Sequence, residues 1–250
     1  MYDYEKGKER IVTILNNNAE IEEVKSIPKD EKEFTYGNGI YSWVTAVFVD
    51  IRGSKDIYAN EDKRIVAKLI RAFTSEVIQI LDDETRREIG IQGDCVYSIY
   101  SSSTKESELN IADKTFYVNT FMKMLNTLLE EKGYSPIKVG IGMSTDKELI
   151  IKAGKKGSGI NSKVWIGEAV SKAAYYSSLG NKDGNEPIVY GSQSYKSFID
   201  KLCDRNSTKN PRDWFKYVEN ENIYIADIIK VEFNEWIANG LKEEKNDGPN

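Results

Sequence analysis

The feature that most constrains the fold is a pair of short β-prone runs that lie only three residues apart. The stretch REIGIQGDCVYSIY covers residues 87–100, and Gln92-Gly93-Asp94 separates its two runs. A Gly-Asp pair between runs rich in β-branched and aromatic residues is typical of a tight turn. The sequence therefore predicts an antiparallel hairpin with Asp94 at its tip.

An amphipathic helix is predicted on each side of this hairpin. Apolar residues recur every three or four positions, which is the period of one helix face. Asn60 precedes the first of these stretches and is of a type that caps helix N-termini. The apolar residues are Val66, Leu69, Ile70, Phe73, Val77, Ile80 and Leu81 in the first helix, and Val118, Phe121, Met122, Leu125, Leu128 and Leu129 in the second.

Further strands and a third helix complete the pattern. Residues 41–50 are rich in β-branched and aromatic types and predict a strand before the first helix. IKVGIGMS (137–144) and ELIIKAG (148–154) predict two more strands, and GEAVSKAAYYSS (167–178) predicts a helix. A late hairpin is predicted within residues 213–229.

Helices that alternate with strands, one pair of which forms a hairpin, predict an α+β fold with helices flanking a mainly antiparallel sheet. We divide the chain into an N-terminal extension (1–35), a main domain (36–203), a hairpin and helix that complete it (204–240) and a disordered tail (241–250).

The composition excludes several classes of function. A formal net charge of −5 argues against a protein that coats nucleic acid. The longest apolar runs fall well short of the roughly 20 residues that a membrane-spanning helix needs. Two cysteines form neither a disulfide framework nor a thiolate metal site, which favours a reducing cytoplasm. The chain has no histidine, which excludes histidine-dependent nucleophiles and histidine-ligated zinc.

Two aspartates form the main candidate site. Asp50 ends the strand WVTAVFV, and Asp94 lies at the hairpin tip. If the strand pairs beside the hairpin, both carboxylates reach the same rim of the sheet. Such carboxylates repel unless a cation neutralises them, and Mg²⁺ typically uses one or two carboxylates together with phosphate oxygens. The carbonyl of Ile51 could complete the ligand set.

The turn after Asp50 suits an anionic ligand. Arg52 can pair with phosphate through its planar guanidinium, and Gly53 allows the backbone to approach closely. Ser54 opens the following segment, whose first N–H groups can face an anion if it is helical. The strand would thus hold a metal, and Arg52-Gly53-Ser54 would receive the phosphates bound to it.

A purely structural interpretation stands beside this one. An aspartate at a strand end commonly caps a turn, and Gly-Asp is an ordinary hairpin dipeptide. Each feature alone favours that interpretation. Their combination in a strand–helix–hairpin order favours the metal site.

On these motifs the chain resembles the class III nucleotide cyclases, the adenylate and guanylate cyclase homology domain. The matching stretches are VFVDIRGS, GIQGDCVYSIY, IKVGIGMS and VWIGEAVSKAAYYS, in that order, within roughly residues 41–200. The resemblance implies a ferredoxin-like βαββαβ core that dimerises head to tail, with active sites between the subunits. It also implies two Mg²⁺ or Mn²⁺ ions on Asp50 and Asp94, with help from the Ile51 carbonyl, and cyclisation of a nucleoside triphosphate.

The sequence departs from the purine cyclases at their base-reading positions. Those enzymes carry a Lys or Glu four residues before the second metal aspartate, where this chain has Gly90, and a second polar reader where it has Val164. The closest resemblance is to the pyrimidine cyclases of the Pycsar anti-phage systems. It implies a homodimer that makes cyclic UMP from UTP, and an effector that responds to this product rather than binding the enzyme directly.

A second departure concerns the late helix. The family places an Asn and, four residues later, an Arg there, where this chain has Ser171 and Tyr175. Ser171 can still bind a ribose oxygen, but Tyr175 cannot replace a cation. Lys172 lies beside the site, and Arg52 could supply the missing charge.

Several alternatives stay open at this stage. The substrate could be CTP or a purine nucleotide, or the domain could bind a nucleotide without cyclising it. A diguanylate cyclase or polymerase-palm relative uses similar carboxylates, but the chain has no GGDEF-like hairpin, and its acidic charge disfavours a nucleic-acid groove.

Overall fold

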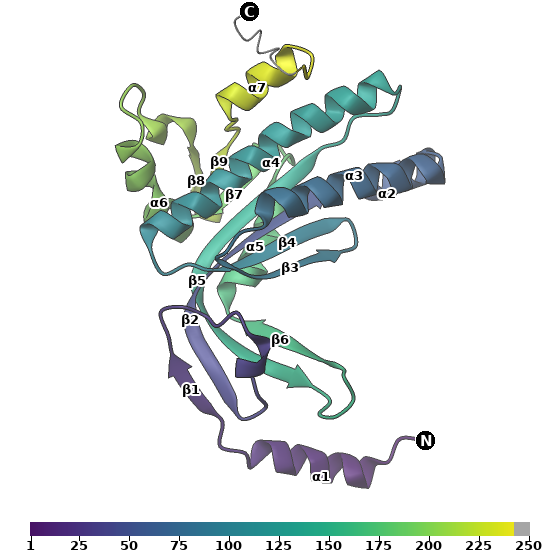
Figure 1. Cartoon of the computed structure of the whole chain (residues 1–250), viewed down its shortest axis with the longest axis vertical. Coiled ribbons are helices and arrows are strands. Elements are labelled where there is room, and N and C mark those ends of the chain that lie inside the picture. Colours follow the sequence, from purple (N-terminus) through teal and green to yellow (C-terminus); the bar gives the residue numbers. More distant parts are fainter. Residues whose placement is uncertain (243–250) are drawn as a thin grey trace, which may run out of the picture.

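A single mixed sheet of nine strands organises the described part of the chain, residues 1–242 (Figure 1). The computed structural model describes residues 1–242. The strands follow the order β3-β4-β2-β5-β7-β9-β8, and β1 and β6 pair with β2 and β5. The strands are β1 (Glu20–Glu23), β2 (Asn38–Ile51), β3 (Arg86–Gln92), β4 (Cys95–Ser101), β5 (Val139–Gly154), β6 (Asn161–Ile166), β7 (Ile188–Gly191), β8 (Lys216–Val218) and β9 (Ile223–Ala226).

Seven α-helices and three short 3₁₀ turns connect and cover these strands within residues 1–242. The helices are α1 (Tyr4–Leu15), α2 (Ser54–Asn60), α3 (Lys63–Leu81), α4 (Lys105–Glu131), α5 (Glu168–Leu179), α6 (Ser192–Asp204) and α7 (Val231–Ala238). The 3₁₀ turns are η1 (Glu31–Glu33), η2 (Pro211–Trp214) and η3 (Glu219–Glu221).

The segment from β2 to β5 confirms the predicted ferredoxin-like core. Its elements run β2, α2, α3, β3, β4, α4 and β5, with α2 and α3 together in the place of the first helix, and the strands lie side by side as β3-β4-β2-β5. Most neighbouring pairs are antiparallel, whereas β1 with β2 and β5 with β7 are parallel. The fold is therefore α+β with a mainly antiparallel sheet, as expected from the sequence.

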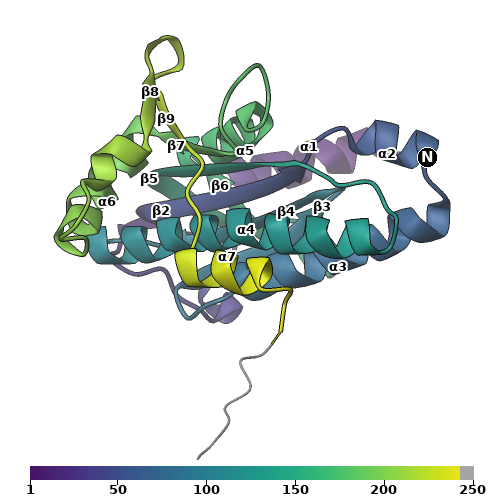
Figure 2. The same cartoon turned by 90° about the horizontal axis from the view of Figure 1, so that it is seen from above.

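The two faces of the sheet are covered differently. Helices α3 and α4 lie on one face, and α5 lies on the other (Figure 2). Val47, Val49 and Ile51 of β2 join the larger apolar cluster with α3 and α4. Their alternating neighbours Ala46 and Phe48 join a second cluster that includes residues of α5. This alternation follows from the two-residue period of a strand.

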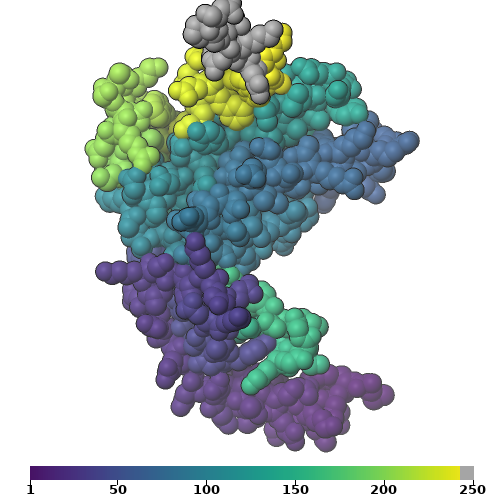
Figure 3. Space-filling model, in the orientation of Figure 1, coloured from purple at the N-terminus to yellow at the C-terminus, as the bar shows by residue number. Residues whose placement is uncertain are grey.

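The long strands β2 and β5 extend beyond the main body and form a curved arm with β1, β6 and α1 (Figure 1). A hollow separates this arm from the body on the face seen in Figure 3. The N-terminal extension contributes β1 to the arm, where Glu20–Glu23 pair with Asn38–Tyr41 of β2.

Two details differ from the sequence expectations. The predicted strands at 137–144 and 148–154 are one continuous 16-residue strand, β5, because their intervening polar residues also pair with β2. Asn60 ends the short helix α2 instead of capping α3. The N-cap of α3 is Asp62, whose side chain accepts from the Arg64 amide.

The predicted late hairpin is confirmed as β8 and β9. Of the predicted disordered tail, residues 243–250 lie outside the described residues, and the domain boundaries stay a prediction.

Candidate functional site

The structure brings Asp50 and Asp94 to the same rim of the sheet. Asp50 pairs with Cys95 of β4, whose preceding residue is Asp94 in the turn after β3. Both aspartates are half-buried. Burial raises the pKa of Asp50, the Arg52 guanidinium opposes that shift, and the Asp94 carboxylate adds to it. The two carboxylates therefore lie close enough to repel each other, which is the electrostatic condition that a cation relieves.

The donor set at this rim fits a hard divalent cation that also holds phosphate. Within residues 1–242 no group of three or more His, Cys, Asp or Glu side chains could hold a metal ion. The candidate ligands at the rim are the Asp50 and Asp94 carboxylates, and Ile51, at the end of β2, supplies a backbone carbonyl beside them. Mg²⁺ is commonly bound by one or two carboxylates plus substrate phosphates, so this limited set is sufficient.

Arg52 lies at the rim, but its guanidinium is engaged by the protein. Nη2 donates to Asp50 Oδ2 at 2.5 Å and to the Ser177 carbonyl at 2.8 Å, and Nη1 donates to the Ser178 carbonyl at 2.9 Å. Only 19% of its side chain is exposed. The arginine predicted to bind phosphate is thus held between a candidate metal ligand and the end of α5.

Gly53 and Ser54 form the turn that sequence analysis expected. Gly53 has a φ of +65°, a left-handed conformation that glycine adopts without strain, and it is the N-cap of α2. No side chain caps this helix, which begins at Ser54. The N–H groups of its first turn therefore have no side-chain partner.

The predicted substrate residues of α5 do not reach this rim. Ser171 donates to the Gly167 and Glu168 carbonyls within its own helix, and Lys172 pairs with Glu168. Arg52 contacts the opposite end of α5, at Ser177. Ser177 is six positions after Ser171, which is about 9 Å along the helix axis.

Tyr175, which stands where the family places an arginine, is also turned outward. Its side chain is 49% exposed, and its hydroxyl donates to Glu221 at 3.0 Å. No cation replaces the expected arginine at this point of α5. Position 175 therefore lacks the positive charge that the family places there.

Helix α5 lies directly on β5 because two glycines leave room for it. A Cβ at Gly140 would lie 2.0 Å from the Ser177 carbonyl oxygen, and one at Gly142 would lie 2.2 Å from the Ala173 oxygen. Because these neighbours are backbone atoms, a larger residue would force the helix away. The glycines of the GIG motif thus set how closely α5 approaches the strand that pairs with Asp50.

Sequence analysis missed Glu148, a fully buried carboxylate on β5. Its Oε1 accepts from the Ala169 amide at 2.6 Å and the Val170 amide at 3.2 Å, at the N-terminus of α5. Burial raises its pKa, whereas these two amide hydrogen bonds oppose the shift. Its signal in the sequence is weak, because Glu148 follows four other polar residues in the middle of a strand.

The base-reading position at Gly90 is filled by a neighbouring aromatic ring. Gly90 pairs with Tyr97, and a Cβ on Gly90 would lie 2.7 Å from that ring. Tyr97 stacks on Phe48 at 5.3 Å and donates to Glu88 at 3.0 Å. The Trp165 indole donates to the other oxygen of Glu88 at 2.7 Å. The ring that fills this space belongs to a hydrogen-bonded Glu88–Tyr97–Trp165 network, which was also missed from the sequence.

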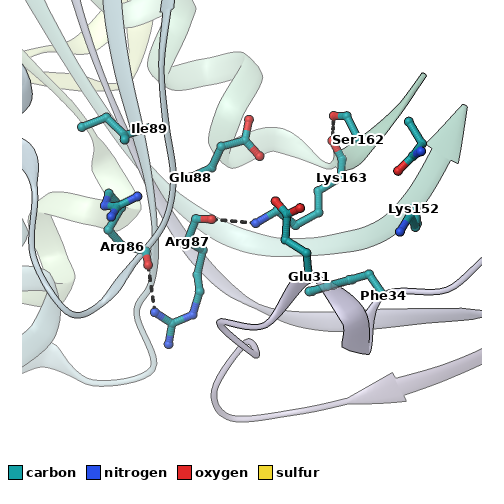
Figure 4. A pocket seen from close by; sticks show the side chains of 10 residues that line it. Glu31, Phe34, Arg86, Arg87, Glu88, Ile89, Lys152, Ser162 and Lys163 are labelled. Atoms are coloured by element: carbon teal, nitrogen blue, oxygen red, sulfur yellow. Dashed lines mark hydrogen bonds between the residues drawn. The ribbon is translucent and has the colours of Figure 1, made fainter. Parts of the chain in front are cut away.

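Beside this network lies a polar cavity of about 300 Å³ (Figure 4). Glu88 extends into it from β3, and Lys163 of β6 donates to the Arg87 carbonyl at 2.7 Å. Neither Asp50 nor Asp94 lines it. The cavity is lined by Glu31, Phe34, Arg86, Arg87, Glu88, Ile89, Lys152, Asn161, Ser162 and Lys163.

Comparison with known protein families identifies the family of this chain. The family model for the adenylate and guanylate cyclase catalytic domain matches residues 38–183. The chain belongs to this family. The match spans β2 to α5 and includes both aspartates, and it confirms the family assignment made from the motifs.

Two relatives match along nearly the whole chain. A uridylate cyclase from Treponema porcinum is 46% identical over 245 residues, covering 98% of this chain and 84% of the relative. A uridylate cyclase from Gulbenkiania mobilis is 30% identical over 247 residues, covering 94% and 95%.

Solved structures support the fold. The adenylyl cyclase CyaB from P. aeruginosa superposes with a TM-score of 0.58 at 17% identity, covering 75% of this chain and 95% of that one. A class III adenylyl cyclase-like ATP-binding protein from Pseudomonas aeruginosa reaches 0.68 at 16% identity, covering 93% of this chain and 48% of that one. In residues 1–242, none of the helices combines the length and apolar character needed to span a bilayer.

Proposed function

We propose that the chain is a uridylate cyclase that converts UTP into 3′,5′-cyclic UMP and diphosphate. The observation that carries this proposal is the pairing of Asp50 beside Cys95, which puts the Asp50 and Asp94 carboxylates at one rim of a cyclase-family sheet. The substrate follows from the relatives named uridylate cyclase, the nearer of these two being 46% identical.

In the reaction, the ribose 3′-hydroxyl loses its proton to solvent as its oxygen forms a bond to the α-phosphorus, the bond from that phosphorus to the bridging oxygen breaks, and diphosphate leaves. Asp50, Asp94 and the Ile51 carbonyl would hold two divalent cations, Mg²⁺ or Mn²⁺. When bound, such cations lower the pKa of the attacking hydroxyl and neutralise the departing phosphates. Gly53 leaves space for the triphosphate beside the uncapped N-terminus of α2.

A second copy of the chain is needed to complete this site. Ser171 is exposed and Lys172 is partly exposed on α5, and both lie more than a helical turn from the residues that contact Arg52. We propose that the enzyme is a head-to-tail homodimer in which Ser171 and Lys172 of one subunit face the nucleotide held by its partner.

The packing around Gly90 argues against a purine-reading side chain at this position. The Tyr97 ring occupies the space that a purine-reading side chain at this position would use. Because Phe48 and Glu88 hold the ring in place, a pyrimidine fits this proposal better than a purine. UTP is preferred over CTP because of the relatives' names.

The proposal also includes a cellular setting. We place the enzyme in the cytoplasm, as a source of a second messenger in anti-phage defence. Its cyclic nucleotide would act on a separate effector, with no direct contact between enzyme and effector.

One experiment tests the activity and the base together. The purified protein is incubated with UTP, CTP, ATP or GTP and Mn²⁺, and products are separated by chromatography and identified by mass spectrometry. The proposal predicts cyclic UMP as the main product. Cyclic CMP or a cyclic purine nucleotide as the main product would replace the substrate assignment.

The rival function is nucleotide binding without cyclisation. Tyr175 favours it, because no cation stands at that position to stabilise charge in the transition state. Intact nucleotide in all four reactions, together with retained binding of UTP measured by calorimetry, would favour this rival over the cyclase.

A further inference from the structure

Helix α5 is attached to the sheet by a charged group at each end. At its N-terminus, the Glu148 carboxylate accepts from the first free amides of the helix, those of Ala169 and Val170. Glu148 is fully buried, and its second oxygen has no hydrogen-bond partner among the described residues. Gly167 packs closely beside it, because a Cβ there would lie 2.8 Å from the carboxyl carbon.

At the C-terminus of α5, Arg52 forms the opposite contact. Its guanidinium donates to the carbonyls of Ser177 and Ser178, which belong to the last turn. The final four carbonyls of a helix have no partner within the helix, so Arg52 supplies donors that α5 lacks. The signs of the charges also match the helix dipole, with an anion at the N-terminus and a cation at the C-terminus.

Arg52 connects this helix end to the candidate metal site. The same Nη2 that donates to the Ser177 carbonyl donates to Asp50 Oδ2. Nε of Arg52 is buried and has no partner among the described residues, so it does not reach outward toward a ligand. The guanidinium therefore has little capacity left for a triphosphate, although the turn around it suits one.

We propose that Arg52 and Glu148 are positioning residues that fix α5 relative to the aspartate rim. Ser171 and Lys172 project from this helix, so its placement on Gly140 and Gly142 sets how one subunit presents these side chains to the other. This inference rests on the proposed cyclase function for its catalytic consequence. The attachment of α5 itself can be tested without turnover.

The first test is hydrogen–deuterium exchange, read by mass spectrometry, on the nucleotide-free protein. Arg52→Gln should speed exchange of the amides in residues 176–180 by about tenfold or more, because the last turn loses its side-chain donors. Arg52→Lys should give a smaller increase, since one ammonium group cannot span two carbonyls and Asp50. Arg205→Gln, which removes an exposed arginine paired with Glu106 on a distant surface, is the control.

The N-terminal contact has its own pair of variants. Glu148→Ala should speed exchange at Ala169 and Val170 by about tenfold, whereas Glu148→Gln keeps an acceptor oxygen and should rescue most of the protection. Glu108→Gln, a buried glutamate on α4, should leave exchange in α5 unchanged.

Kinetics separate positioning from phosphate binding. With UTP and Mn²⁺, Arg52→Lys should lower kcat by about tenfold or more and change KM by no more than about twofold. A large rise in KM with unchanged exchange in α5 would show that Arg52 binds the triphosphate, and would overturn the proposal. Unchanged exchange in the Arg52 and Glu148 variants would overturn it equally.

Failure of the proposed function would be visible separately. If the wild-type protein forms no cyclic nucleotide, faster exchange in α5 still supports its attachment by Arg52 and Glu148, while the cyclase assignment falls. If the wild-type protein is active and α5 exchange never changes, the cyclase stands and the positioning role is wrong.

Discussion

The two faces of the sheet are held by different kinds of interaction. On the face of α3 and α4, large apolar side chains such as Phe73, Val77 and Phe121 pack with almost no exposed surface. On the opposite face, α5 is placed by glycines and by two charged groups, the buried Glu148 and the partly buried Arg52. Apolar packing stabilises without specifying direction, whereas hydrogen bonds to helix ends fix an orientation. Both faces contain buried apolar clusters that supply stability, and on the second face the hydrogen bonds at the ends of α5 also fix the direction of the helix.

The largest effect is expected at the rim on the α5 side. Asp50→Asn or Asp94→Asn should lower formation of cyclic UMP by about 1,000-fold or more, because each removes a charged oxygen ligand from the site. The free energy of unfolding should change by no more than about 1 kcal/mol, since both positions are partly exposed. Product chromatography and urea unfolding measure the two quantities.

Asp204→Asn is the matched control, because this exposed aspartate pairs only weakly with Lys201 on α6, at 3.7 Å. It should retain full activity. Turnover within about threefold of wild type in both rim variants would show that neither aspartate is needed for the reaction.

The next largest effect tests stability on the α3–α4 face. Phe73 is fully buried, so Phe73→Ala should lower the free energy of unfolding by about 3–5 kcal/mol through lost burial and a cavity. Tyr58→Ala, at an exposed position on α2, should change it by about 0.5 kcal/mol or less. Equal losses in the two variants would show that α3 contributes little to the core.

A smaller effect is expected where α5 rests on β5. A methyl group at Gly142 would meet the Ala173 oxygen and the Ser177 nitrogen at 2.2 Å, so Gly142→Ala should cost about 1–3 kcal/mol of stability. It should also lower kcat, because α5 must shift. Gly37→Ala has free space around its new methyl group and serves as the control. Denaturant titration and steady-state kinetics would detect both changes, and an unchanged Gly142→Ala enzyme would refute the close seating of α5.

The smallest effect concerns Glu108, a polar exception on the α3–α4 face. Burial raises its pKa to about 7, while Ser197 and Lys105 oppose the shift. The folded protein then binds this proton more tightly than the unfolded chain, so stability falls as pH rises from about 4.5 to about 7. Relative to Glu108→Gln, wild type should lose about 1–3 kcal/mol between pH 5 and pH 8. A difference that does not vary with pH would place Glu108 in a more solvated environment.

Much of the fold was predictable because local patterns agree with tertiary packing. Helical periodicity located α3 and α4, and the turn at Gly93-Asp94 located the β3–β4 hairpin. The continuity of β5 was not predictable, because Asp146, Lys147 and Glu148 are poor strand formers that the pairing with β2 overrides. The cap of α3 was placed at the wrong residue because Asn60 and Asp62 are both of a type that caps helices well.

The candidate site was predictable only in part. Asp50 and Asp94 could be brought together on the condition that the strand before α2 pairs beside the hairpin, and the pairing of β2 with β4 meets that condition. Glu148 and the partners of Arg52 could not, because their contacts depend on how α5 crosses the sheet. The packing of Tyr97 over Gly90 was also hidden, since a glycine does not reveal which side chain fills its space.

The most direct test of the central claim is Mn²⁺ binding in the presence of a non-cyclisable UTP analogue, measured by electron paramagnetic resonance. Wild type should bind two Mn²⁺ ions per active site, and Asp50→Asn and Asp94→Asn should each lose at least one of them or bind at least tenfold more weakly. Equal stoichiometry and affinity in all three proteins would contradict a cation site shared by the two aspartates.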